Sequence, residues 1–121
     1  MKFDNSIPIY LQIIDKIKEG VVLGDIKIGD KLPSTRELAV KYSVNPNTVQ
    51  RVYKELEAEG MCYTKRGLGT YIKEDEEMVM GMKNKMAEKL IDSFVVGMKQ
   101  LGFSYDEMLK IIETKKLNEV K

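Results

Sequence analysis

Two helix-start signals stand eleven positions apart in the first half of the chain. Ser34-Thr35-Arg36-Glu37 has the pattern of a capping box, in which serine and glutamate satisfy each other's free backbone amides. Asn45-Pro46 joins a preferred N-cap residue to the residue best tolerated at the first helical position. This spacing leaves room for one short helix, over about 34–42, and a tight link. A second helix must then start at about residue 46.

The second of these helices is amphipathic. Val49, Val52, Tyr53 and Leu56 recur at the spacing of one helical face, and Gly60 is a suitable left-handed terminator. The pattern predicts a helix over about 46–59 that buries this stripe.

The flanking segments complete a small domain. Isoleucines and valines at helical spacing predict a helix over about 8–23, and two Gly-Asp pairs with a proline predict a loop over 24–33. Residues 61–64 and 70–72 read as short strands. The segment 65–69 joins them in a β-hairpin with a basic tip, where glycines accept positive φ.

A methionine-rich stripe follows. An acidic run at 74–77 suits a helix start, and apolar residues then recur to predict a helix over about 75–100 that stops at Gly102. A second capping box at 104–107 opens a final helix to about 115, after which the chain should fray. We expect the apolar residues of this tail to form a dimer interface: Met78, Met82, Met86, Leu90, Phe94, Met98, Leu101, Met108, Leu109 and Ile112.

The predicted fold is mainly α with a small β-hairpin. The order of helix, short helix, tight turn, helix and hairpin is that of a winged helix-turn-helix, whose second motif helix lies in the DNA major groove. We assign residues 1–74 to a DNA-binding domain and 75–121 to a two-helix dimerisation tail.

Composition argues against several other classes. The chain has no histidine and one cysteine, Cys62, so a zinc site or a histidine-based nucleophile is not expected, nor is any cofactor or enzymatic activity. An unpaired cysteine favours a reducing, cytoplasmic setting, and no apolar run approaches the roughly 20 residues of a membrane span. Residues 1–73 hold 12 Lys and Arg against 9 Asp and Glu, a balance of +3, whereas 74–121 hold 8 against 10, a balance of −2. The sign favours an anionic partner for the first part.

The solvent side of the 46–59 helix carries residue types that bind base edges and phosphates. Its glutamates lie at the far end, so we expect its N-terminal turns to approach DNA, where the helix dipole also favours anions. The first turn of the preceding helix and the hairpin tip add further candidates. The DNA-contacting residues predicted in this way are Ser34, Thr35, Arg36, Asn47, Thr48, Gln50, Arg51, Lys54, Lys65, Arg66, Gly67 and Gly69.

The strings that carry this pattern resemble those of GntR-type regulators. They are Pro8-Ile9-Tyr10, the segment 29–39, the segment 44–49, Tyr53 with Leu56 and Gly60, and Arg66-Gly67 with Gly69-Thr70-Tyr71. The resemblance covers about residues 8–73. It implies DNA contacts at Arg36, Asn45, Asn47, Thr48, Gln50, Arg66 and Gly67. Many members carry arginine where Pro46 and Gln50 stand here, and this departure leaves the exact operator bases open. Pro46 is also among the predicted DNA contacts.

About 48 residues follow the hairpin, too few for the large effector domain that GntR-type proteins usually carry. The chain therefore resembles the short YtrA-like subgroup. The resemblance implies a homodimer, joined through the helical tail, that represses transcription by binding a near-palindromic operator in double-stranded DNA.

Other interpretations remain open at this point. The polar face of the 46–59 helix could be an ordinary solvent-exposed surface, and the winged helix could bind a protein without contacting DNA. The methionine stripe could form a ligand pocket instead of packing against a second copy. A small effector, if one exists, is expected near Tyr10, Met82 and Met86. Cys62 is expected to pack as a small apolar residue, with a redox switch as the alternative.

Overall fold

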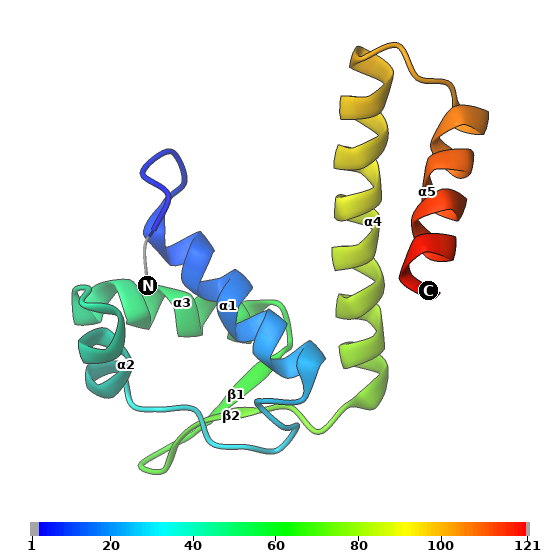
Figure 1. The fold of residues 1–121 in the computed structure, drawn as a ribbon. Coiled ribbons are helices and arrows are strands. Elements are labelled where there is room, and N and C mark those ends of the chain that lie inside the picture. Colours follow the sequence, from blue (N-terminus) through cyan, green and yellow to red (C-terminus); the bar gives the residue numbers. More distant parts are fainter. Residues whose placement is uncertain (1–2, 121) are drawn as a thin grey trace. The chain divides into compact units, whose positions relative to one another are not determined.

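The structure is a computed structural model that describes residues 3–120. Its elements follow in the order α1 (Ile9–Leu23), α2 (Thr35–Tyr42), α3 (Pro46–Ala58), β1 (Cys62–Lys65), β2 (Gly69–Ile72), α4 (Glu76–Gln100) and α5 (Tyr105–Val120) (Figure 1). The chain forms two compact units, one ending at Met82 and the other beginning at Lys83, within α4. The predicted class, mainly α with a two-stranded hairpin in a winged helix-turn-helix, is confirmed.

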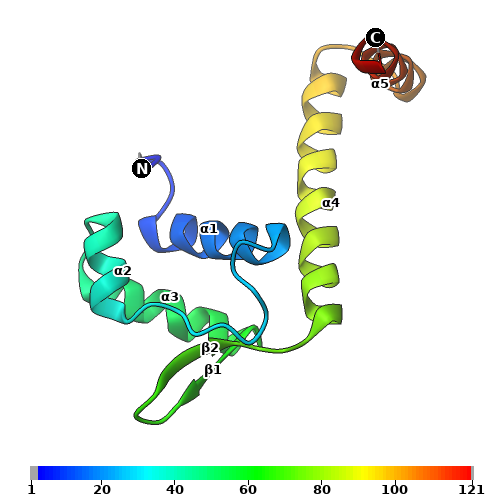
Figure 2. The same ribbon diagram turned by 60° about the horizontal axis from the view of Figure 1, so that its bottom comes forward.

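The first unit is built around the apolar stripes of α1, α2 and α3. Ile13 of α1 and Val49, Val52 and Leu56 of α3 are fully buried, and Leu38 of α2 is nearly so. The hairpin follows directly from the end of α3 (Figure 2). The core therefore consists mainly of the residues whose helical spacing predicted it, joined by Met61, Cys62 and Ile72 from the hairpin region.

Both predicted helix starts are formed. The Ser34 hydroxyl accepts from the Glu37 N–H (3.1 Å), and the Glu37 carboxylate accepts from the Ser34 N–H (3.2 Å). The Asn45 side-chain oxygen accepts from the Asn47 N–H (2.8 Å). Between α2 and α3, Ser43 adopts a left-handed conformation with φ 54°, which makes the link a tight turn.

The loop predicted over 24–33 is partly wrong. Lys31 forms a β-bridge with Tyr71, the Leu32 N–H donates to the Thr70 carbonyl (2.8 Å), and the Ile72 N–H donates to the Asp30 carbonyl (2.9 Å). Strand β2 is therefore paired with β1 on one side and with this segment on the other. Glycines and a proline around the segment hid an extended stretch too short to show periodicity.

Two helix ends also differ from the prediction. Pro8 is the N-cap of α1 and not its first helical residue. Helix α5 continues to Val120, beyond the predicted end near 115. Neither glycine nor proline follows Gly102 in the sequence, so nothing local stops this helix.

The predicted interface stripe has three kinds of surroundings. Met78 and Met82 are partly buried against the core of the first unit. In the second unit, Met108 is 3% exposed, so it offers little surface to a partner. Two further stripe members, Leu90 and Leu101, are each 74% exposed. The division into a DNA-binding part and a dimerisation part stays a prediction.

The turn between α4 and α5 follows the expected signals. Gly102 is left-handed (φ 93°), and the Phe103 N–H donates to the Met98 carbonyl (3.0 Å). Ser104 and Glu107 form the second capping box, with bonds of 3.2 and 3.0 Å. Within residues 3–120, none of the helices has the length and apolar content needed to cross a bilayer.

Candidate DNA interface

The N-terminal turns of α3 present the polar face that the sequence predicted. Asn47, Gln50 and Lys54 are exposed, whereas Thr48 is half-buried. Asn45 is occupied as the helix cap, so its side chain already holds one backbone amide. The positive end of the helix dipole lies here and favours an anion such as a phosphate. The face therefore suits a recognition helix.

Tyr53 connects α3 to the start of α2. Its hydroxyl donates to the Pro33 carbonyl at 2.6 Å, one residue before the N-cap Ser34. Burial raises the pKa of Tyr53 above its usual value, so the hydroxyl keeps the proton that it donates. The bond holds the segment leading to Arg36 against α3, and Arg36 itself is exposed at the first turn of α2.

Arg51 has a partner within the protein. Its guanidinium lies over the Tyr10 ring of α1, 3.7 Å from the ring centroid. At the other end of α3, Lys18 Nζ lies 2.8 Å from Glu59 Oε2. These contacts attach α3 to α1 at two points. The predicted contact of Arg51 with DNA stays a prediction. The stacking on Tyr10 also allows Arg51 to position α3.

The wing, defined as residues 62–72, has an aromatic outer side. The rings of Tyr63 and Tyr71 stack with centroids 5.8 Å apart at an interplanar angle of 20°. Lys65 Nζ lies 4.6 Å from the Tyr71 ring centroid, which restrains that cation. Arg66 is exposed at the turn, beside Gly67 with φ 78°.

The two wing glycines differ in their surroundings. A Cβ at Gly67 would meet open space, whereas a Cβ at Gly69 would lie 2.8 Å from Lys31 Cε. The exposed Lys31 side chain can move aside, but φ 119° at Gly69 is a conformation that other residues rarely adopt, so the backbone itself favours glycine there besides the close DNA approach that we predicted for both.

Sequence reasoning missed Lys31 as part of this surface. A groove of about 290 Å³ separates the start of α2 from the wing, and Lys31, Ser34, Thr35 and Gly69 all line it. The structure brings Lys31 here through its β-bridge to Tyr71. That pairing joins residues 40 positions apart, so no local pattern indicated it.

Cys62 is buried at 4% exposure, as the packing interpretation expected. Burial raises the pKa of its thiol to about 12, with a smaller contribution from the charge of Glu57. A reactive thiolate is therefore disfavoured near neutral pH. Among the described residues, no group of three potential metal ligands lies together.

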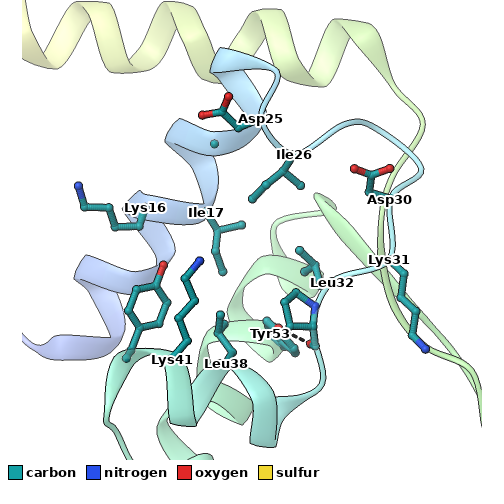
Figure 3. Close-up of a pocket in the computed structure, with 13 residues that line it drawn as sticks. Lys16, Ile17, Asp25, Ile26, Asp30, Lys31, Leu32, Leu38, Lys41 and Tyr53 are labelled. Carbon is teal, nitrogen blue, oxygen red and sulfur yellow. Dashed lines mark hydrogen bonds between the residues drawn. The ribbon is translucent and has the colours of Figure 1, made fainter. Parts of the chain in front are cut away.

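The expected effector position involves both units, because Met82 belongs to the first and Met86 to the second. It stays a prediction, although Tyr10 is now seen to be covered by Arg51. A separate cavity of about 350 Å³ lies within the first unit, between α1, α2 and the 25–33 segment (Figure 3).

Residues 9–72 match the family described as bacterial regulatory proteins, gntR family. The chain belongs to the GntR family. Two similar relatives come from Bacillus subtilis (strain 168). The uncharacterized HTH-type transcriptional regulator YhcF is 47% identical over 113 residues, covering 93% of each chain. The HTH-type transcriptional repressor YtrA is 48% identical over 99 residues, covering 77% of this chain and 76% of the relative.

Solved structures extend the likeness along the chain. A GntR family regulator from Listeria monocytogenes matches with a TM-score of 0.86 and 41% identity, covering 93% of this chain and 98% of that one. The DNA-binding domain of AraR, solved in complex with operator ORX1, matches with a TM-score of 0.52 and 27% identity, covering 55% of this chain and 80% of that one. The resemblance to the GntR family and its YtrA-type members is confirmed.

Proposed function

We propose that this GntR-family protein is a homodimeric repressor that binds a near-palindromic operator. The observation that carries the proposal is the exposed polar N-terminal face of α3, flanked by Arg36 on α2 and Arg66 on the wing. The similarity to the repressor YtrA supports the direction of regulation. We infer a cytoplasmic location, where such a protein meets its DNA.

The exposed side chains divide by chemistry. Amides such as those of Asn47 and Gln50 form paired hydrogen bonds with adenine, so we assign base reading to them. Arg36, Lys54 and Arg66 are cations on three separate elements, suited to phosphates on both sides of the major groove. We regard Ser34 as a cap first, because its hydroxyl is already bonded to the Glu37 amide.

The proposed dimer rests on apolar side chains that a single chain leaves in water. In the second unit Leu90, Leu101, Leu109 and Ile112 are all more than half exposed. A patch of this kind is costly in water, and a second copy can bury it. Two-fold symmetry would then present two recognition helices about 34 Å apart, or a multiple of that distance.

The DNA proposal is tested by selecting binding sites from random duplexes and measuring the affinity of the selected site by fluorescence anisotropy. We expect paired half-sites and a Kd that weakens steeply with salt, because phosphate contacts release counterions. Arg36→Ala should weaken binding about tenfold and lower the salt slope by about one. Lys110→Ala, an exposed change on α5, is the control and should leave both unchanged.

Salt-insensitive binding would contradict the proposal. So would intact promoter binding by both Arg36→Ala and Arg66→Ala, and that result would favour a winged-helix protein–protein module instead.

The dimer is tested by sedimentation. Replacing Met86 and Leu90 with glutamate should yield monomers and weaken operator binding, because charges would then face an apolar interface. Lys89→Glu inserts the same side chain at an exposed polar position between them and should remain dimeric. An unchanged dimer in the double variant would overturn the assignment of the tail.

A further inference from the structure

The cavity between α1, α2 and the 25–33 segment has an apolar wall. Ile17, Leu32 and Leu38 line it and are each only 4% exposed, and Ile26 and Pro33 complete the apolar surface. Its volume of about 350 Å³ lies within the range of about 300–1,000 Å³ that is typical of small-molecule sites. The lining comes entirely from the first unit.

The charged groups of this cavity are unevenly placed. Lys41 of α2 extends alongside Leu38 toward Ile17, into the opening (Figure 3). Its Nζ lies 5.5 Å from the Tyr42 ring centroid. The acidic side chains of Asp25 and Asp30 lie around the other end, beyond Ile26 (Figure 3).

Not every charge in the lining is equally free to bind a ligand. Lys16 pairs with Glu19 at 3.6 Å, and in Figure 3 it points away from the cavity. Lys31 points away toward the wing. The carboxylate of Asp30 accepts from the Lys27 N–H (2.9 Å). Lys41 is therefore the cation best placed to meet a ligand.

This arrangement selects for one ligand chemistry. An anionic group is attracted to Lys41 and repelled from the acidic end, so it sits at the α2 side. The body of the ligand then lies along Ile17 and Ile26, and it must be apolar to compensate for the water it displaces. Tyr42 offers an aromatic ring at the charged end.

We propose that this cavity binds a small apolar carboxylate and that its occupancy changes operator affinity. The cavity wall includes Pro33, whose carbonyl holds Tyr53 of α3, and Leu38 of α2. A ligand bound there contacts α2, the helix that carries Arg36. It also contacts the Tyr53–Pro33 hydrogen bond that holds the start of this helix against α3. Linkage requires that DNA changes ligand affinity by the same factor. The regulatory half of this proposal rests on the proposed DNA-binding function, whereas the site itself does not.

The site is tested on the full chain without DNA, by titrating ¹⁵N-labelled protein with 2-naphthoate and following backbone amide shifts. We expect saturable shifts centred on residues 16–20, 25–26 and 38–42. The neutral 2-naphthamide should bind about two- to fivefold more weakly, because it lacks the charge that meets the solvent-exposed Lys41. Octanoate, a carboxylate with a flexible body, should compete for the same amides.

Lys41→Glu should weaken 2-naphthoate binding at least about tenfold, since attraction is replaced by repulsion. Lys27→Glu makes the same charge change on the adjoining segment, outside the lining, and should bind like the wild type. Lys41→Met keeps most of the side-chain stem and should fall between them. Equal loss in the two glutamate variants, or no shifts from either carboxylate at millimolar concentration, would overturn the site.

Regulation is then measured as the operator Kd with and without saturating 2-naphthoate. We expect a change in the wild type that is absent in Lys41→Glu. Binding with an unchanged Kd would overturn the regulatory half. Because the shift titration contains no DNA, a failure of operator binding would be recognised separately.

Discussion

The hydrogen bond from Tyr53 to Pro33 gives the sharpest test of how α3 is attached to the start of α2. Tyr53 is 7% exposed, and its hydroxyl donates to the Pro33 carbonyl at 2.6 Å. Tyr53→Phe removes this donor and leaves the ring packing in place. An intramolecular hydrogen bond contributes about 0.5–1.5 kcal/mol net to the free energy of unfolding. A buried acceptor left without any partner costs about 1–3 kcal/mol.

The surroundings of the acceptor decide between these values. Pro33 is an exposed residue, so water can reach its carbonyl once the hydroxyl is gone. We therefore expect a loss of about 1 kcal/mol in the free energy of unfolding. For a unit of this size, that corresponds to a fall in Tm of about 4–8 °C. Urea unfolding followed by circular dichroism should show a lower midpoint with an unchanged slope.

Tyr42→Phe is the matched control. Tyr42 is half-buried at the end of α2, and its hydroxyl makes no hydrogen bond to any of residues 3–120. Its loss should stay within about 0.5 kcal/mol. Equal destabilisation by the two substitutions would refute the view that this bond clamps α3 to the entry of α2. Operator affinity of Tyr53→Phe, measured well below its Tm, should also fall because Arg36 is then less firmly placed.

Three further predictions concern other residues of the first unit. As pH rises from about 9 toward 12, the unfolded chain loses the Cys62 proton while burial keeps the pKa of the folded thiol at about 12. Cys62 alone should therefore lower the free energy of unfolding by up to about 1.4 kcal/mol per pH unit, and Cys62→Ala should remove this share of the slope in urea titrations while the share of buried Tyr53, whose pKa is also raised, remains. Gly69→Ala should cost more stability than Gly67→Ala, because φ 119° at Gly69 lies outside the left-handed helical region whereas φ 78° at Gly67 lies close to it, and thermal unfolding would show the opposite order if this is wrong. Arg51→Ala should lower stability by about 0.5–1 kcal/mol through loss of the Tyr10 contact, whereas an unchanged midpoint would assign Arg51 to DNA alone.

The elements that sequence reasoning predicted well are those specified by neighbouring residues. Both capping boxes form, and Gly24, Gly60 and Gly102 adopt the left-handed conformations expected at helix ends. Such signals act within four or five positions and need no knowledge of the rest of the chain. The same holds for the stripe of α3, whose spacing alone specified its buried face.

The elements that escaped prediction depend on residues far apart in sequence. The pairing of Lys31 with Tyr71 requires the whole helix-turn-helix to fold between them. The paired stretch around Lys31 is too short to show alternation, and the nearby Gly29 and Pro33 read as loop signals. The cavity beside Lys41 is of the same kind, because its wall comes from α1, α2 and the segment between them.

The candidate site itself shows why a residue list from sequence mixes two roles. Residue type and helical position predict DNA contact equally for Arg51, Gln50 and Asn47, since all are polar and on the solvent side of one helix. All three are exposed, and only packing distinguishes them. The Arg51 guanidinium lies over the Tyr10 ring of α1, whereas Asn47 and Gln50 have no such partner among the described residues. A residue that holds α3 in place should affect every DNA sequence equally, whereas one that reads a base should affect some sequences more than others. Binding-site selection repeated with Arg51→Ala and with Gln50→Ala therefore distinguishes the two roles directly: the selected sequence should change only for the second.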